Sequence, residues 1–301
     1  MRSAVIYSDI FLKHDLPTHP ENALRLKYFM EPVGELQLPV IPPKQVSYEL
    51  LKTIHSENYI QDVLIACREN APGFFDPDTY YNSYTCDAAL TAAGACELGV
   101  ELLSSGEFEA VFCAVRPPGH HAERDRAMGF CIFNNVAVAA VKALSLGAKR
   151  VFIVDFDAHH GNGTQHAFYS TPEVFYFSTH QFPFYPGTGS ERENNSHVLN
   201  VPLREGSGDS TFKRVYSITF REALRSFSPD VVLVSAGYDL HRDDPLTGLD
   251  VTDEGVRAVV EQVVEGAKEV GAPLLFTLEG GYNLNALKRC SRITFETLLS
   301  G

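Results

Sequence analysis

One stretch of the sequence sets the expected architecture: Val151-Phe152-Ile153-Val154-Asp155-Phe156-Asp157-Ala158-His159-His160-Gly161-Asn162-Gly163. Its first four residues are β-branched or aromatic, which is typical of a strand buried on both faces of a parallel sheet. Asp155, Asp157 and His159 follow at alternate positions, so they project to one side while the chain stays extended. Open α/β sheets bind their ligands at the carboxyl ends of parallel strands. The stretch therefore predicts an α/β fold with a functional site after this strand.

Similar short apolar runs recur along the whole chain, and helical patterns lie between them. Predicted strands are Ala4–Tyr7, Val111–Val115, Val151–Phe156, Val174–Ser178, Val198–Val201, Val231–Ser235 and Leu274–Leu278. Predicted helices are Ser83–Leu103, Asn134–Leu144, Ser210–Phe227 and Asp253–Val270. Alternating strands and helices favour a sheet covered by helices on both faces. No linker or internal repeat divides the chain, so we expect one domain spanning residues 1–301.

Composition excludes several classes of protein. The chain has 301 residues, of which 45% are hydrophobic, and its formal charge is 25 − 38 = −13. The apolar content excludes a disordered chain, and the acidic balance argues against direct binding to nucleic acid. No apolar stretch is long enough to span a membrane, and the first residues are typical of a strand rather than a signal peptide. Six scattered cysteines in apolar segments predict buried free thiols in a reducing cytoplasm.

Polar residues follow two of the predicted strands and suggest a metal site. Asp157 and His159 follow one strand, and Asp239 ends the run Val231-Val232-Leu233-Val234-Ser235-Ala236-Gly237-Tyr238-Asp239. Two carboxylates and an imidazole leave a fourth position open for water, which is typical of catalytic zinc. A structural interpretation would require each of these polar groups to be paired inside the fold.

Two further turns carry candidate catalytic groups. The turn Arg116-Pro117-Pro118-Gly119-His120-His121-Ala122-Glu123 presents adjacent histidines suited to proton transfer, with Asp155 and Asn162 as their orienting partners. The turn Leu278-Glu279-Gly280-Gly281-Tyr282-Asn283 presents a phenol that could donate to a substrate carbonyl. The alternative interpretation of the histidines is a surface pair without function, and that of the tyrosine is a buried side chain hydrogen-bonded to the backbone.

Taken together, these segments resemble the histone deacetylase family, within the arginase–deacetylase fold. The matching motifs run in order from Arg116–Glu123 through Gly129–Asn134, Asp155–Gln165 and Ser235–Asp239 to Leu278–Asn283. His14, His19-Pro20-Glu21 and Arg25 extend the match toward the start of the chain. Asn162 and Glu279 resemble the class II and bacterial deacetylase-like branch.

The resemblance implies a mostly parallel sheet of about eight strands and a role for each motif residue. It implies Zn²⁺ at Asp157, His159 and Asp239, a set of donors that also suits Fe²⁺. It implies proton transfer by His120 and His121, of which His121 is the preferred base, assisted by Asp155 and Asn162. It also implies carbonyl polarisation by Tyr282, tunnel walls at Gly129, Phe130 and Tyr185, and a structural K⁺ near Asp155 and Ser178.

The predicted function is a zinc-dependent amidohydrolase that removes an acyl group from acyl-lysine or a related N-acyl amine. An acetylpolyamine or another small N-acetyl amine is the alternative substrate, and the oligomeric state stays open. Asp76 or Asp78 could hold the substrate at the rim, or both could belong to a turn. An arginase-like enzyme with two metals is disfavoured, because Gly161 and His241 stand where it needs carboxylates. An inactive module that binds acylated ligands is a further alternative.

Overall fold

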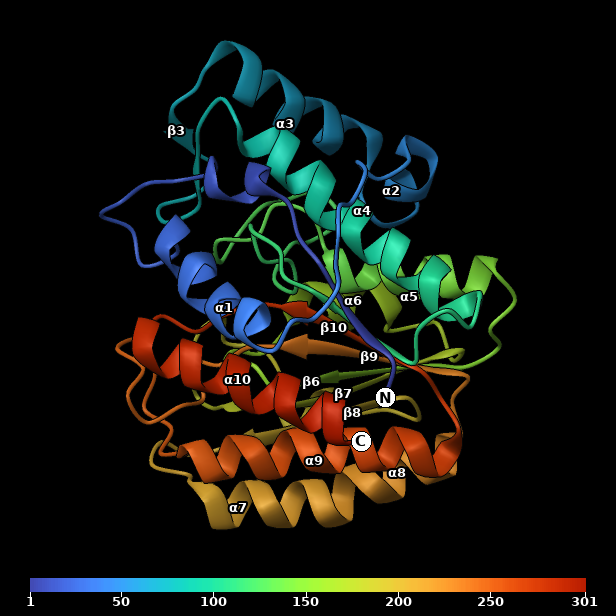
Figure 1. Cartoon of the computed structure of the whole chain (residues 1–301). Coiled ribbons are helices and arrows are strands. Elements are labelled where there is room, and N and C mark those ends of the chain that lie inside the picture. The colour runs from blue at the N-terminus through green and yellow to red at the C-terminus, as the bar shows by residue number, and fades with distance from the viewer.

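The computed structural model describes residues 1–301, and a single eight-stranded sheet runs through its centre (Figure 1). The order of the strands is β2-β1-β5-β10-β9-β6-β7-β8, and every neighbouring pair is parallel. The strands are β1 (Ser3–Ile6), β2 (Val40–Ile41), β5 (Ala110–Cys113), β6 (Val151–Asp155), β7 (Val174–Gln181), β8 (Val198–Leu203), β9 (Val231–Ala236) and β10 (Leu274–Leu278). A separate antiparallel pair consists of β3 (Gly73–Phe74) and β4 (Tyr80–Tyr81).

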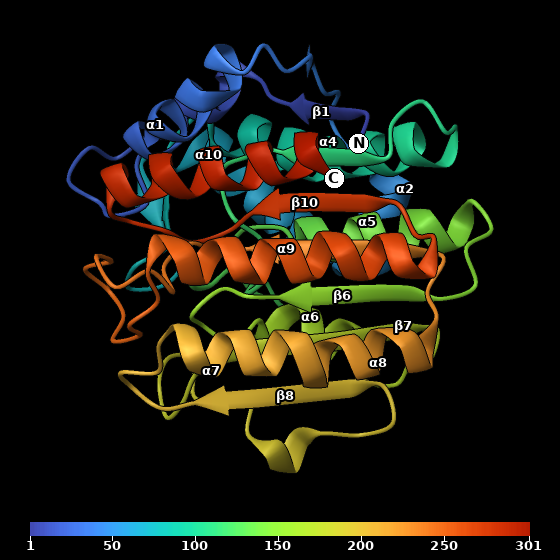
Figure 2. The same cartoon turned by 60° about the horizontal axis from the view of Figure 1, so that its bottom comes forward.

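Helices cover both faces of the sheet. One face carries α1 (Ala23–Glu35), α7 (Asp209–Arg214), α8 (Arg221–Phe227), α9 (Asp253–Val270) and α10 (Leu284–Ser300), as Figures 1 and 2 show from two directions. The other face carries α2 (Tyr48–Ile54), α3 (Glu57–Glu69), α4 (Thr85–Ser104), α5 (Asn135–Ser145) and α6 (Asn162–Phe168). Short 3-10 turns are η1 (Asp9–Leu12) and η2 (Glu191–Glu193), and a π turn, η3 (Val215–Phe220), joins α7 to α8.

The structure confirms the predicted α/β class, with a parallel sheet of eight strands and helices on both faces. The seven predicted strands all occur; β2 is the additional strand of this sheet, and the pair β3 and β4 was not predicted either. The stretch predicted as one helix, Ser210–Phe227, is divided by the π turn η3.

The centre of the sheet is apolar along its strands and polar at its carboxyl edge. Every residue of β5, β6, β9 and β10 is buried, and these four strands are consecutive in the sheet. In register, Asp155 lies opposite Ser235, which lies opposite Thr277. Because parallel strands end at the same edge, the loops after these four strands converge there.

The expectation of six free thiols is wrong for two cysteines. Cys67 and Cys86 form a disulfide between the last turn of α3 and the first turn of α4, with their Cα atoms 6.0 Å apart. The two residues lie 19 positions apart, and packing of the two helices brings their ends together, which a linear pattern does not reveal. The other four cysteines are free and buried. The cysteine pattern therefore no longer supports a reducing compartment.

None of the helices has the length and apolar character that a membrane-spanning segment requires.

Candidate active site

Two carboxylates and one imidazole meet at the carboxyl edge of the central strands. Asp157 and His159 follow β6, and Asp239 follows β9. Their candidate ligand atoms all lie within 4.8 Å of one another. His159 Nδ1 is 2.9 Å from Asp239 Oδ2 and 3.1 Å from Asp157 Oδ1. The structure thus brings together the three residues that the sequence predicts as metal ligands.

Backbone groups crowd both carboxylates and fix their orientation. The N–H of Gly280 donates to Asp157 Oδ2, and the N–H of Ala158 donates to Asp239 Oδ1, each at 2.8 Å. A Cβ on Gly237 would overlap the Asp157 carboxylate, and a Cβ on Gly280 would overlap both carboxylates. Glycine is required at these two positions because the backbone passes directly over the acidic side chains.

This cluster concentrates negative charge in a buried place. Asp157 and Asp239 are 1% and 0% exposed. Burial disfavours the charged form of His159, but Asp239 and Asp157 outweigh burial and raise the pKa of His159 to about 10. Metal ligands must be deprotonated, so a divalent cation can take the place of the proton on His159. Two oxygen donors, one nitrogen donor and an open side toward a pocket suit zinc.

The two predicted catalytic histidines lie beside this cluster with different partners. His120 Nδ1 is 3.0 Å from Asp155 Oδ2, whereas His121 Nδ1 is 2.8 Å from Asn162 Oδ1. The centroids of the two imidazole rings are 4.0 Å apart, and both side chains are buried. Both predicted orienting partners are therefore in contact with their histidines.

The different partners give the two imidazoles opposite electrostatics. Burial lowers the pKa of His120, but Asp155 and Asp157 outweigh burial and raise it to about 10. Burial and the charge on His120 together hold the pKa of His121 well below its ordinary value. His121 is therefore neutral and has one basic ring nitrogen.

Asp155 and Ser178, the predicted potassium ligands, lie opposite each other on β6 and β7. Asp155 already receives hydrogen bonds from the Tyr176 hydroxyl (3.0 Å) and the Asp157 N–H (3.2 Å) besides its contact with His120. Ser178 Oγ lies 2.8 Å from His180 Nδ1. Potassium binding at this pair stays a prediction.

Tyr282 extends from the loop after β10 toward the same edge. Its N–H donates to Asp244 Oδ2 at 2.7 Å, and the Arg25 guanidinium lies 4.8 Å from the centroid of its ring. Burial, assisted by Asp239 among the nearby carboxylates, raises the pKa of Tyr282 well above its ordinary value. The phenol therefore keeps its proton at neutral pH and is available as a hydrogen-bond donor.

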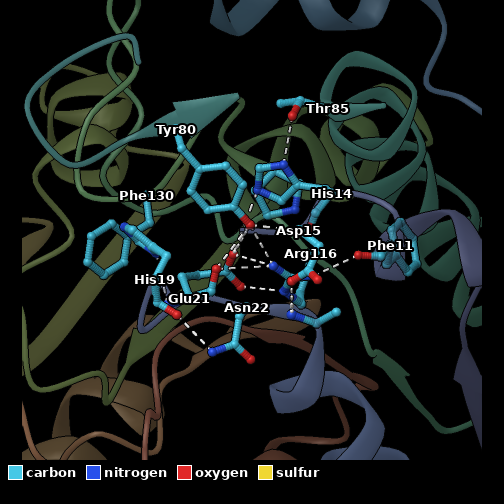
Figure 3. A network of polar contacts seen from close by, with 12 residues as sticks. Phe11, His14, Asp15, His19, Glu21, Asn22, Tyr80, Thr85, Arg116 and Phe130 are labelled. Atoms are coloured by element: carbon cyan, nitrogen blue, oxygen red, sulfur yellow. Dashed lines mark hydrogen bonds and ion pairs between the residues drawn. The ribbon is translucent and has the colours of Figure 1, made fainter. Parts of the chain in front are cut away.

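A buried ionic network around Glu21 contacts the backbone of this loop through Arg25, and Figure 3 shows Glu21 with Arg116. Glu21 accepts hydrogen bonds from Arg116 at 2.5 and 2.6 Å and from Arg25 at 2.8 Å. Arg25 donates in addition to the carbonyl groups of Gly281 and Glu279, both at 2.6 Å. Burial raises the pKa of Glu21, but Arg116 and Arg25 outweigh burial and lower it to about 2. The network therefore ties the start of the chain to the loop that carries Tyr282.

Glu279 connects the same loop to the histidine turn. Its carboxylate accepts hydrogen bonds from the N–H groups of Gly119 (2.8 Å) and His120 (3.1 Å) and from the Ser235 hydroxyl (3.2 Å). The sequence marks Glu279, Glu21 and Arg25 only as motif positions and does not reveal these contacts. A hydrophobic pattern carries no signal for them, because their partners lie far away in the sequence.

A pocket of about 270 Å³ opens onto His121, His159 and Tyr282. Its other lining residues are Asp78, Gly129, Phe130, Phe184, Tyr185 and Leu246. The three predicted wall residues line this pocket, and Phe184 and Leu246 are additional apolar walls that were not predicted. Apolar walls beside these polar groups suit an aliphatic chain that ends in a reactive polar group.

The two candidate rim residues have different positions. Asp76 Oδ1 accepts the N–H groups of Asp78 (3.1 Å) and Thr79 (2.6 Å), so its carboxylate belongs to the turn. The backbone carbonyl of Asp78 is 2.9 Å from His19 Nε2, and Asp78 itself lines the pocket. Asp78 is therefore the acidic residue available to a ligand.

Comparison with protein families gives one match over most of the chain. The family model described as "Histone deacetylase domain" matches residues 19–298 of this chain. A protein named probable deacetylase from Archaeoglobus fulgidus is 34% identical, with 94% of this chain and 82% of that protein covered. Histone deacetylase 14, chloroplastic, from Arabidopsis thaliana is 36% identical, with 98% of this chain and 76% of that protein covered.

Two solved structures share the whole fold. The crystal structure of the HDA15 HD domain superimposes with a TM-score of 0.93 at 34% identity, covering 99% of this chain and 91% of that one. The structure of acetylpolyamine aminohydrolase from Burkholderia pseudomallei gives a TM-score of 0.90 at 25% identity and covers 98% of each chain.

Proposed function

Because the chain belongs to the histone deacetylase family, a family of amide-hydrolysing deacetylases, we propose that it is a zinc-dependent amidohydrolase acting on acyl-lysine or a related N-acyl amine. The observation that carries the proposal is the cluster of Asp157, His159 and Asp239 beside two buried histidines and a phenol, at the end of an apolar pocket. The proposal treats residues 1–301 as one catalytic domain.

Asp157, His159 and Asp239 would hold the zinc ion. When bound, the ion supplies Lewis-acid activation of the amide carbonyl and of the attacking water. Fe²⁺ suits the same donors, and metal availability decides much of that choice. A structural K⁺ at Asp155 and Ser178 belongs to the same proposal.

His121 acts as the base. Its basic nitrogen accepts a proton from the water that attacks the acyl carbon. Tyr282 donates a hydrogen bond to the carbonyl oxygen, and this hydrogen bond becomes stronger as negative charge develops on that oxygen. The C–N bond then breaks, and protonated His121 returns a proton to the leaving amine. The products are a carboxylate and a free amine, and His120, hydrogen-bonded to Asp155, supplies positive charge beside the reaction.

The pocket walls select the substrate. Gly129, Phe130 and Tyr185 would enclose the aliphatic stem of an acylated amine, with the amide at the far end. A small N-acetyl amine is the second candidate, and one observation favours it. Asp78 gives the pocket an acidic group that could pair with a substrate ammonium group.

The proposal is tested by hydrolysis of a matched set of amides. The zinc-loaded protein and a chelated control would receive acetyl-lysine peptide, trifluoroacetyl-lysine peptide, longer acyl-lysine peptides, N-acetylputrescine and N⁸-acetylspermidine. We expect metal-dependent release of the carboxylate, and the order of rates identifies a peptide or a free amine as the preferred substrate. A folded, zinc-loaded protein that cleaves none of them would contradict the proposal and favour an inactive binding module.

A further inference from the structure

A row of polar side chains leads from His121 away from the pocket to the surface of α6. Asn162 Nδ2 donates to Glu123 Oε1 at 2.5 Å and, over a longer distance of 3.3 Å, to the backbone carbonyl of His121, while Asn162 Oδ1 faces the His121 ring. Both carboxylate oxygens of Glu123 face His166 Nδ1, at 2.9 and 3.0 Å. Asn162 is buried, whereas the Glu123 and His166 side chains are 19% and 49% exposed. Neither Glu123 nor His166 lines the substrate pocket.

The order of donors and acceptors along this row is fixed from its outer end. An ionised carboxylate only accepts hydrogen bonds, so Asn162 must turn its NH₂ group toward Glu123. The Asn162 carbonyl oxygen then faces His121 Nδ1, which must carry the hydrogen. Because a neutral imidazole carries one hydrogen, the lone pair of His121 is on Nε2.

The surroundings of Glu123 keep its carboxylate ionised and in place. Burial raises the pKa of Glu123, but hydrogen bonds from His166 and Asn162 outweigh burial and lower it, and Arg126 adds to this effect. The hydrogen bond to Glu123 raises the pKa of His166 against burial, while Arg126 opposes that shift. The backbone of Glu123 is tied to Arg126 by an N–H···O bond of 2.9 Å.

The backbone of the segment that carries Glu123 lies directly against α6, the helix that carries Asn162 and His166. Asn162 and His166 are four residues apart in α6, on one face of that helix. Between them, a Cβ on Gly163 would overlap the carbonyl oxygen of Ala122. Glycine at this position allows the amide of Asn162 to reach the Glu123 carboxylate.

We propose that Glu123 is a positioning residue for proton transfer. Acting through Asn162, it holds His121 in the tautomer with hydrogen on Nδ1, which leaves Nε2 free to accept a proton, and His166 holds Glu123. The inference rests on the proposed function, in which His121 is the base. His120 needs no such help, because its partner Asp155 is itself a carboxylate. An asparagine can present either its oxygen or its NH₂ group, and the short hydrogen bond to Glu123, together with the longer one to the His121 carbonyl, removes that choice.

The first test replaces Glu123 by alanine. We expect kcat on an acetyl-lysine peptide to fall about 10–100-fold, the range that is typical when a residue that orients another active-site side chain is removed. KM should change by less than about twofold and bound zinc should not change, because neither substrate nor metal touches Glu123. Glu31→Ala is the matched control, because Glu31 is an exposed carboxylate that pairs with Lys288 and does not line the pocket. Unchanged kcat in Glu123→Ala would overturn the inference.

A polarity-reversal cycle separates positioning from packing. Asn162→Asp places a second carboxylate against Glu123, so the two carboxyl groups share a proton that can turn toward His121 Nδ1. The double variant Asn162→Asp/Glu123→Gln restores a fixed donor at position 123 and a fixed acceptor toward His121 in the same shape. We expect the double variant to be at least about tenfold faster than Asn162→Asp at pH 8, which is strong non-additivity between neighbours. Losses that simply multiply would indicate packing alone and contradict the inference. The cycle applies even if Glu123→Ala fails to fold.

A spectroscopic readout does not depend on activity. The ¹⁵N chemical shifts of the His121 ring in the zinc-loaded protein should indicate hydrogen on Nδ1 in the wild type and a mixture of tautomers in Glu123→Ala. Identical shifts in the two proteins would contradict the inference. A protein that hydrolyses no amide but shows the shift change would refute the proposed function while supporting the role of Glu123.

Discussion

Two clusters in this protein have the residue types of a metal site, and each takes one residue from the loop after β9, Asp239 in one and His241 in the other. One consists of Asp157, His159 and Asp239, and the other consists of His241, Asp253 and Cys290. In both clusters the candidate ligand atoms lie within 4.8 Å of one another. Proximity and residue type therefore do not distinguish them, and the difference lies in how their charges are already paired.

In the second cluster the charges are satisfied by protein groups. Arg289 Nε contacts both carboxylate oxygens of Asp253, at 2.8 and 3.1 Å, and His241 Nε2 lies 2.9 Å from Asp253 Oδ1. His241 Nδ1 accepts the N–H of Asp243 at 3.1 Å. Burial raises the pKa of the Cys290 thiol, so the thiolate that a metal needs is disfavoured.

In the first cluster no lysine or arginine pairs with the carboxylates. Asp157 and Asp239 are buried, and histidines are the cationic partners within reach. Buried carboxylates without a fixed cation favour binding of a metal ion. The comparison indicates that buried carboxylates paired only with histidines are a stronger candidate for a metal site than a cluster whose carboxylate already pairs with an arginine.

The largest expected effect separates the two clusters directly. Asp157→Ala should abolish stoichiometric zinc binding and lower kcat/KM by about 10³-fold or more, since metal activation contributes several kcal/mol to the transition state. Asp253→Ala is the matched control and should retain one zinc per chain. Elemental analysis with steady-state hydrolysis checks both variants. Stoichiometric zinc in Asp157→Ala would overturn the ligand assignment.

Tyr282→Phe sharpens the comparison by separating metal binding from catalysis. We expect zinc content to stay at one per chain while kcat falls about 10²–10³-fold, as for the loss of an oxyanion donor. The phenol is held by Arg25 and by the backbone contact with Asp244, and phenylalanine keeps the same shape. Near-normal turnover in this variant would remove Tyr282 from the mechanism.

Metal removal should affect stability through the first cluster alone. A ligand present at about 1,000 times its Kd stabilises the folded state by about 4 kcal/mol. We therefore expect a chelator to lower the Tm of the wild type and of Asp253→Ala, and to leave the Tm of Asp157→Ala unchanged. Thermal unfolding with and without chelator measures this. An equal decrease in all three proteins would place the bound metal outside the first cluster.

Cys290→Ser should have the smallest effect. Serine keeps a small side chain at a buried position, so we expect a loss of about 1 kcal/mol in unfolding free energy, the central value for single substitutions. Zinc content and kcat should be those of the wild type. A loss of bound zinc in this variant would show that the second cluster is a metal site.

The sequence predicts the parts of the molecule that depend on local pattern. The strands before Asp155, Asp239 and Glu279 are continuous apolar runs, and the polar residues after them share one edge because the strands are parallel. Asp253–Val270 was predictable because valines recur at helical spacing, and α9 has the same bounds. Motif order then identified the candidate residues around the pocket.

The remaining features depend on contacts between distant segments. Glu21 meets Arg116 across 95 residues, and Cys67 meets Cys86 only because α3 and α4 pack together. β2 has two residues, too few to show a period, and the π turn within Ser210–Phe227 keeps a helical pattern. Leu246 lines the pocket from a loop, where no periodicity applies.

The most direct measurement is anomalous diffraction at the zinc edge from crystals of the zinc-loaded protein. We expect one strong peak among Asp157, His159 and Asp239 and no peak at His241, Asp253 and Cys290. A peak at the second cluster, or no peak at the first, would contradict the claim that this protein is a metal-dependent amidohydrolase with its catalytic ion at the end of the apolar pocket.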